Sequence, residues 1–280
     1  AHGLRIMMCP HCPASRSRGF TLVELIIVLM ITSIIGVVLA KVIPPAFNSY
    51  IDQRTRADLT DQADTALRRM LRDVRRAVPN SIRIPSDQCF ELVPSASGGR
   101  YRANIDTTCS GCSMALDTSQ ATTTFDVLTT LQTTPAVGDW VVVDNQTSND
   151  VYAGNNRSAL TAIATPAAAA GHHRLTVNSK QFPIGYDGGR FMIVANNQQS
   201  VFYICSGADG TVDAQGNGKG TLYRLVRGFT SAYPGSCPAT TGADVVATRV
   251  KSCTFVYDPN QGATQQSGFV WTQIELSRNN

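Results

Sequence analysis

The chain has 280 residues, which suits one domain or a domain with an extension. Hydrophobic residues make up 43%, enough for a buried core, whereas charged residues make up only 16%. Few charges and abundant Gly, Ser, Thr and Asn indicate an extracytoplasmic, β-rich protein. The net charge of +4 is too small to predict a nucleic-acid partner. Three of the positive charges, Arg5, Arg16 and Arg18, precede Phe20, so the rest of the chain is almost neutral.

The segment from Phe20 to Ile43 is apolar apart from Glu24 and Lys41. As a helix it would be about 36 Å long, enough to cross a hydrocarbon core of about 30 Å. A secretory signal peptide has a shorter apolar run and a small-residue cleavage site, which this segment lacks. Basic residues before the segment favour a cytoplasmic N-terminus. The sequence therefore predicts a single-pass membrane anchor, with the chain beyond Lys41 exported.

Glu24 is an unusual residue in such a segment. A carboxylate near the middle of a membrane costs about 2–3 kcal/mol or more, and less near the interface. A simple anchor does not explain this residue, because an ionised group in hydrocarbon needs a partner.

The stretch from Arg18 to Leu25, which reads Arg-Gly-Phe-Thr-Leu-Val-Glu-Leu, resembles the processing signal of type IV prepilins and pseudopilins. The resemblance implies that a prepilin peptidase removes residues 1–19 by cleaving between Gly19 and Phe20. The new amine of Phe20 would then be methylated. The resemblance also implies that Glu24 pairs with this amine, within one subunit or between neighbouring pilin subunits, and so selects the register of assembly.

Beyond the anchor, helical spacing continues over residues 44–79 as an amphipathic extension. We expect Pro44 and Pro45 to kink or loosen the helix, and Pro79 to end it. Arginines on the other face are interspersed with aspartates, which favours a solvated face over a phosphate or nucleic-acid patch. The predicted apolar stripe consists of Leu59, Ala63, Ala66, Leu67, Met70, Leu71, Val74 and Val78.

After Asn80 the pattern changes to short β runs separated by Gly, Asn and Pro. We expect Gly98-Gly99 and Gly188-Gly189 to be turns and residues 164–171 to be a surface loop. The fold class is α+β, with one long helix packed on an antiparallel sheet in a β-rich domain over residues 80–280. The predicted runs are 81–84, 89–93, 140–144, 174–177, 191–195, 201–205, 221–226, 245–250, 254–257 and 269–276.

Several stretches of this region resemble the large minor pilins of the mannose-sensitive haemagglutinin pilus system, which are similar to the J-type minor pseudopilins of type II secretion. The resemblance implies a pilin-like fold and a minor subunit that primes or caps a filament. The stretches are 67–75, 99–102, 138–143, 220–224 and 253–258.

The cysteines after Phe20 form an even set, which predicts disulfides in an oxidising compartment, although their pairing cannot be read from the sequence. Cys109-x-x-Cys112 has thioredoxin-like spacing without a βαβ pattern, so a structural role is favoured, with Cys89 as the nearest cysteine before it. The candidate disulfide residues are Cys89, Cys109, Cys112, Cys205, Cys237 and Cys253.

Other candidate sites are weaker. Cys9-Pro10-His11-Cys12 supplies only half of a zinc site, and it lies in the predicted leader. His172-His173 has no ligand cluster around it, and residues 216–221 lack the order of a phosphate-binding loop. Asp209, Asp213 and Asn217 do not have EF-hand spacing, so a solvated loop is favoured over a calcium site.

We find no nucleophile with an identifiable base, and we expect no catalytic residue, metal or cofactor. The competing interpretation is an exported enzymatic or ligand-binding domain on a simple anchor. Such a domain would need a pocket with convergent polar groups.

Overall fold

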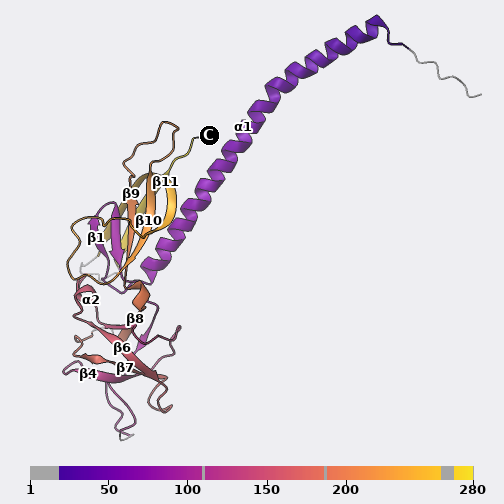
Figure 1. The fold of residues 1–280 in the computed structure, drawn as a ribbon. Helices are drawn as coiled ribbons and strands as arrows, with labels where there is room; N and C mark the ends of the chain where they lie inside the picture. The colour runs from indigo at the N-terminus through magenta and orange to yellow at the C-terminus, as the bar shows by residue number, and fades with distance from the viewer. Residues whose placement is uncertain (1–18, 109–110, 186–187, 260–267, 280) are drawn as a thin grey trace, which may run out of the picture. The chain divides into compact units, whose positions relative to one another are not determined.

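The computed structural model describes residues 19–108, 111–185, 188–259 and 268–279 (Figure 1). Most of the predicted leader, with Cys9, His11 and Cys12, and also Cys109, lies outside these residues. The chain divides into two compact units, residues 1–54 and 55–280. The long helix α1 (Leu22–Arg75) begins in the first unit and ends in the second.

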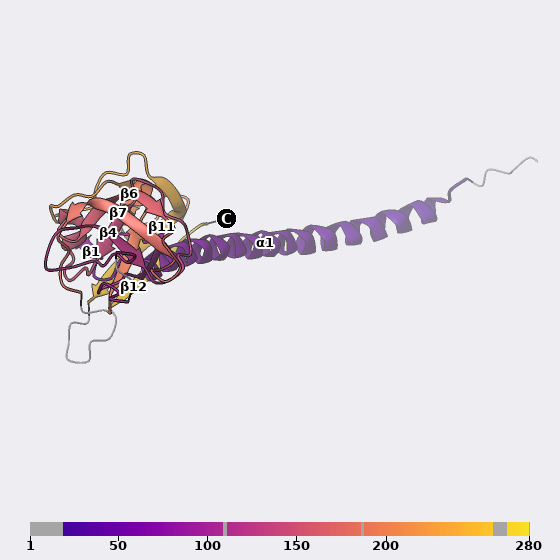
Figure 2. The same cartoon turned by 90° about the horizontal axis from the view of Figure 1, so that it is seen from below.

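The described part of the first unit consists of residues 19–54, and every one of them is exposed. From residue 22 to residue 43 α1 is predominantly apolar around its whole circumference, which is typical of a helix that crosses a membrane. It is the one helix among the described residues that is long and apolar enough to do so, and it contains an 18-residue stretch with a mean hydropathy of 2.8. Pro44 and Pro45 lie inside α1, which continues through both as one helix (Figure 2).

The end of α1 differs from the prediction. The helix ends at Arg75, before Pro79, because the chain there exchanges helical hydrogen bonds for sheet-like ones. Ala77 forms an isolated antiparallel bridge with Pro94, and the Val78 N–H donates to the Val93 carbonyl at 2.8 Å. Pairing with a neighbouring segment, and not proline, therefore sets the boundary.

The first sheet of the second unit has six strands in the order β1-β2-β9-β10-β11-β12, and all neighbours are antiparallel. Ala66 and Met70 of α1 are buried in the core of this sheet. Phe90 stacks on Tyr203 and meets Phe255 edge-on in the same core. The strands are β1 (Arg83–Ser86), β2 (Cys89–Leu92), β9 (Ser200–Ser206), β10 (Gly220–Arg227), β11 (Asp244–Asp258) and β12 (Phe269–Leu276).

The second sheet also has six antiparallel strands, in the order β3-β8-β5-β6-β7-β4. Its core includes Phe125 and Phe191, whose rings meet edge-on. A short helix, α2 (Asp150–Ala153), connects β5 to β6 within this sheet, and a single 3-10 turn, η1 (Asn196–Gln198), connects β8 to β9 of the first sheet. The strands are β3 (Ser97–Arg100), β4 (Thr122–Val127), β5 (Trp140–Val143), β6 (Arg157–Ala164), β7 (His173–Lys180) and β8 (Arg190–Val194).

The predicted α+β class is confirmed, but the strands form two sheets and not one. Every predicted β run overlaps a strand, whereas β3, β4 and β6 were not predicted. The interpretation of Gly98-Gly99 as a turn is wrong, because both residues lie in β3. A Cβ atom on Gly98 would lie 2.9 Å from the Phe191 carbonyl, so glycine permits close approach of the neighbouring strand. Gly188 and Gly189 do have the positive φ of turn glycines.

The apolar stripe of α1 is only partly buried. Ala66, Met70 and Val78 are buried as predicted, whereas Leu67 and Leu71 are 42% and 48% exposed. Both leucines line a groove together with Val270 and Thr272 of β12, which leaves them partly open to solvent. Arg68, Arg72, Arg75 and Arg76 are exposed, as expected of a solvated face, and Arg69 forms an ion pair with Asp244 at 3.6 Å.

Two disulfides have both partners among the described residues. Cys89 of β2 is joined to Cys237 in the loop after β10, and Cys205 of β9 is joined to Cys253 of β11. Cys112 is also disulfide-bonded. Cys89 therefore does not pair with Cys109 or Cys112, although these are its nearest neighbours in sequence.

Candidate processing and assembly site

The predicted cleavage site lies at the start of α1. The Leu25 N–H donates to the Thr21 carbonyl at 3.2 Å, and the Glu24 N–H donates to the Thr21 hydroxyl at 3.2 Å. Thr21 is thus the N-cap of the helix, and Thr21 and Glu24 have the spacing of a capping box. Gly19 and Phe20 precede the helix, and both are exposed.

Gly19 has no role in the fold that requires glycine. Its φ is not positive, and a Cβ atom added to it would have no heavy atom within 4 Å. Glycine is required where the backbone is strained or closely approached, and neither condition holds here. The described fold therefore does not require glycine at this position.

Glu24 lies in the first turn of α1, where the backbone N–H groups give the helix terminus a partial positive charge that stabilises a carboxylate. It is the one charged residue between Phe20 and Ala40. Cleavage after Gly19 would add the charged amine of Phe20 to this same positive terminus, which disfavours a cation. Glu24 is the residue in this segment that can compensate the amine.

One face of the apolar helix carries small residues. Thr32, Gly36 and Ala40 recur at four-residue spacing, which brings them to the same side. The Thr32 hydroxyl donates to the Val28 carbonyl at 2.8 Å, so it needs no partner outside the helix. Small residues spaced in this way allow another helix to approach closely in a membrane.

Residues 14–40 match the family model for the prokaryotic N-terminal methylation motif. The matched segment contains Gly19, Phe20 and Glu24. The match supports the prepilin and pseudopilin family. The protein therefore has a type IV prepilin-like N-terminus, and this motif implies processing by a peptidase and assembly with other pilins. No curated protein and no solved structure matches the chain.

The apolar helix and the prepilin-like motif together are consistent with a membrane-anchored, exported protein. The roles assigned to Gly19, Phe20 and Glu24, and the division of the chain at residues 19, 43 and 79, stay predictions.

The weaker candidate sites have local roles in the structure. The Asp209 carboxylate accepts hydrogen bonds from the Thr211 N–H and hydroxyl, and the Asp213 carboxylate accepts one from the Asn217 N–H. These bonds lower the pKa of both aspartates and use them to close their own turns. The His172 N–H donates to the Val127 carbonyl. Among the described residues, no group of three or more His, Cys, Asp or Glu side chains could hold a metal ion.

A buried ionic cluster around Arg83 was not identified from the sequence. Arg83 is fully buried and lies 3.4 Å from the Glu91 carboxylate, and its guanidinium stacks 3.4 Å above the Tyr152 ring. It also donates to the Ser148 and Thr230 carbonyls, at 3.0 and 3.2 Å. The sequence around Arg83 gives no sign of this cluster, because Tyr152, Ser148 and Thr230 are distant from Arg83 in the chain.

Burial raises the pKa of Glu91, against the opposing effects of Ser200 and Arg83. A carboxyl with a raised pKa is often catalytic, but Glu91 is only 2% exposed and no substrate can reach it. Arg83 instead connects β1 to the loops before α2 and after β10, which indicates a structural role.

Proposed function

We propose that this protein is a structural subunit of a filament, a minor pilin or pseudopilin that helps to prime or cap a type IV pilus or a type II secretion pseudopilus, and that it is not an enzyme. The observation that carries the proposal is the processing motif from Gly19 to Glu24, placed at the capped start of a long exposed apolar helix. An ordinary anchor needs the helix but not the motif.

In this account the chain is inserted into the inner membrane with its basic leader in the cytoplasm and its β-rich domain in the periplasm. A prepilin peptidase cleaves between Gly19 and Phe20, and the Phe20 amine is methylated. The subunit then moves from the membrane into the filament, where its apolar helix packs against those of other subunits.

Glu24 would guide this packing. An ionised amine and a carboxylate in hydrocarbon are each costly alone, and the cost falls only when the two groups meet. A neighbour that is shifted along the helix leaves both groups without a partner. The small face of Thr32, Gly36 and Ala40 would let the neighbouring helix come close enough for the pair to form.

The minor role is supported by two features. The two-sheet domain is bulky for the close packing of a major subunit, and parts of residues 67–258 resemble the large minor pilins of the mannose-sensitive haemagglutinin system. The alternative is an exported ligand-binding or enzymatic domain on a simple anchor. In that case Gly19 would be free to vary, and residues 1–19 would stay attached.

The proposal is tested by comparing the intact mass of the membrane-extracted protein with that of a Gly19→Leu variant. We expect the variant to keep its leader, because leucine would obstruct the peptidase, while its folded domain is unchanged. Gly36→Ala is the matched control, since it changes a helix glycine that also has open space around it, and it should be processed normally. Equal masses for wild type and Gly19→Leu, after allowance for the substitution itself, would reject the proposal.

A further inference from the structure

The second sheet is an insertion in the first. All six of its strands come from one continuous stretch, residues 97–194, whereas the first sheet takes strands from before and after this stretch. The flanking strands β2 and β9 pair directly, with Leu92 opposite Val201, as the two strands of a hairpin would. The stretch, which we call the insert, has an apolar core separate from the core that contains Ala66 and Met70. A continuous segment with its own core has the properties of a folding module.

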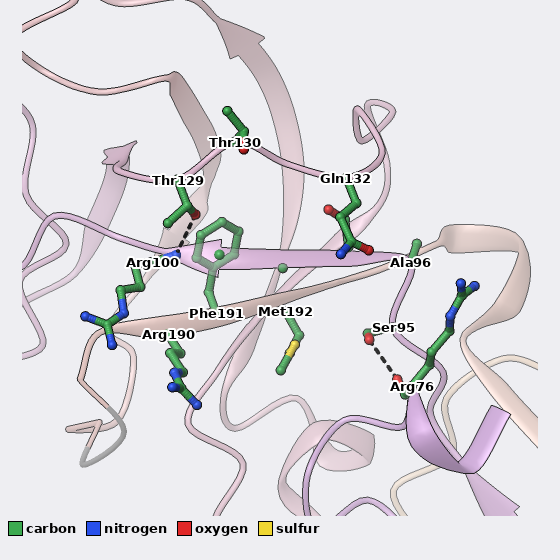
Figure 3. A pocket seen from close by; sticks show the side chains of 13 residues that line it. Arg76, Ser95, Ala96, Arg100, Thr129, Thr130, Gln132, Arg190, Phe191 and Met192 are labelled. Atoms are coloured by element: carbon green, nitrogen blue, oxygen red, sulfur yellow. Dashed lines mark hydrogen bonds between the residues drawn. The ribbon is translucent and has the colours of Figure 1, made fainter. Parts of the chain in front are cut away.

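Two short connectors, residues 93–96 and residues 195–199, join the insert to the first sheet. They run side by side, because the strands at both of their ends are antiparallel neighbours, β2 with β9 and β3 with β8. Figure 3 shows the first connector, in which the Ser95 hydroxyl donates to the Arg76 carbonyl just beyond α1, at 2.7 Å. Two adjacent crossings of this kind form a single axis about which the insert can turn.

Two cavities lie between the insert and the chain that follows α1. The first, of about 410 Å³, is lined by Arg76, Ser95 and Ala96 on one side, and by β3, β8 and the segment 129–132 on the other (Figure 3). The second, of about 240 Å³, is lined by residues 78–80 and by side chains of β5 and β8. Protein interiors are otherwise close-packed, so these cavities mark a part of the junction where the insert is loosely held.

A polar clasp holds another part of the junction together. The Arg83 guanidinium of β1 donates to the Ser148 carbonyl at 3.0 Å and stacks on the Tyr152 ring, and both of these residues belong to the insert. The Tyr152 hydroxyl donates back to the Ser81 carbonyl at 2.9 Å. Phe229, in the loop after β10, meets the Tyr152 ring edge-on. A small apolar cluster with residues from both parts surrounds this ring. We call Arg83, Tyr152 and Phe229 the clasp.

We propose that the insert is a hinged module, which turns on its two connectors when the clasp opens and keeps its own fold as it turns. Hinges are usually a few residues at the ends of elements, and the connectors have this position. The separate core stabilises the insert as a body, the cavities give it space, and the clasp sets the closed position. The insert can therefore move without repacking α1 on the first sheet. The proposal does not depend on processing at Gly19.

Hydrogen–deuterium exchange of the full chain in detergent tests the hinge. In the wild type, amides of residues 93–96 and 195–199 should exchange faster than those of β2 and β9, because a hinge opens more often than the strands it joins. Tyr152→Leu removes the ring on which Arg83 stacks, while the contact of Arg83 with Glu91 remains. We expect this variant to raise exchange in both connectors by about tenfold or more, with the strands of both sheets still protected.

Tyr101→Leu is the matched control, because Tyr101 is a buried tyrosine that packs edge-on against Phe125 in the core of the insert, outside the clasp. It should raise exchange in the strands of the second sheet. Phe229→Ala opens the clasp from the other side and should reproduce the pattern of Tyr152→Leu, so the test does not depend on one variant. Two results would overturn the proposal: wild-type connectors as protected as β2 and β9, or clasp variants in which exchange rises equally through both sheets or stays unchanged in the connectors.

Discussion

Thr21 and Glu24 lie together at the helix start, where different atoms of Glu24 serve the helix cap and the proposed assembly contact. The Thr21 hydroxyl accepts the Glu24 backbone N–H, so the carboxylate of Glu24 is not needed for that cap bond. The side chain of Glu24 can therefore be changed while the Thr21 cap is kept. This separation makes the role of the carboxylate testable.

Glu24→Gln should leave membrane levels equal or slightly higher, because a carboxylate in an apolar span is costly. It should nevertheless reduce recovery in filaments or in a complex with other pilin subunits, because the Phe20 amine loses its charged partner. The measurement is co-purification, compared with membrane content on immunoblots. Unchanged co-purification would show that Glu24 is dispensable for assembly.

The Arg83 cluster gives a prediction for the domain. Glu91→Ala leaves Arg83 buried without a carboxylate and should lower the free energy of unfolding by about 3–5 kcal/mol. Glu91→Gln keeps one oxygen that can accept from Arg83, and its amide group can donate to the Ser200 hydroxyl, so it should cost much less. Chemical denaturation of both variants measures the difference, and equal losses would contradict this account of the cluster.

The raised pKa of Glu91 also predicts a direction with pH. The usual pKa of a glutamate side chain is 4.5, and burial keeps the Glu91 carboxyl of the folded protein protonated to a higher pH. The contribution of Glu91 to stability is therefore present below pH 4.5 and is lost as the pH rises through the folded pKa. The stability of wild type relative to Glu91→Gln should fall over this range. A relative stability that rises would mean that the charge of Arg83 dominates.

Glu275 provides the opposite case on β12. Hydrogen bonds and ion pairing with Lys251, together with Ser252, lower its pKa. The contribution of Glu275 to stability is present above pH 4.5 and is lost as the pH falls through the folded pKa. The stability of wild type relative to Glu275→Gln should therefore rise with pH over this range, opposite to the trend for Glu91.

Among the elements, α1 shows what periodicity can and cannot predict. Three- and four-residue spacing correctly placed Ala66 and Met70 in the core, but it also included Leu67 and Leu71, which are exposed. Periodicity gives the width of an apolar stripe, whereas the neighbouring sheet decides how much of the stripe it covers. The same limit applies to the end of α1, where an isolated bridge from Ala77 to Pro94 stops the helix before Pro79.

Met70→Ala should therefore lower the free energy of unfolding by about 2–5 kcal/mol, as for other buried large-to-small changes. Leu71→Ala, one residue further along the same helix, should cost less than about 1 kcal/mol because Leu71 is 48% exposed. Thermal or urea unfolding of the exported domain in the full chain compares the two. Similar losses would show that Leu71 is buried in the working protein, as by a neighbouring subunit.

The strands were predicted where alternation or apolar runs were strong, as in β9 and β12. They were missed where the strand was rich in Gly, Ser, Thr or Ala, as in β3, β4 and β6. Such residues form strands here because backbone pairing with neighbouring strands and packing against the core stabilise them. Neither contact can be read from the residues of the strand itself. The pairing of Cys89 with Cys237, which is distant in sequence, depends in the same way on the tertiary fold.

At the scale of the whole molecule, the processing motif was readable from sequence because it is local and other proteins must recognise it. The Arg83 cluster was not, because Arg83, Glu91 and Tyr152 come together only after β1, β2 and α2 are in place. Local signals thus predicted the anchor and its processing, whereas the arrangement of the domain in two sheets is known only from the structure.

Export predicts the redox state of the domain. Cys89, Cys205, Cys237 and Cys253 should resist alkylation until a reductant is added. A disulfide contributes about 2–4 kcal/mol, so loss of the periplasmic oxidation system should lower the abundance of the protein. Labelling of all four cysteines without reductant would argue against an exported domain.

The central claim is that the chain is processed as a prepilin, and the N-terminal peptide of the membrane-extracted protein tests it most directly. Mass spectrometry should find a peptide that begins at Phe20 and carries one added methyl group on its amine. A mature N-terminus upstream of Phe20, or further along the chain near Lys41, would contradict the assignment.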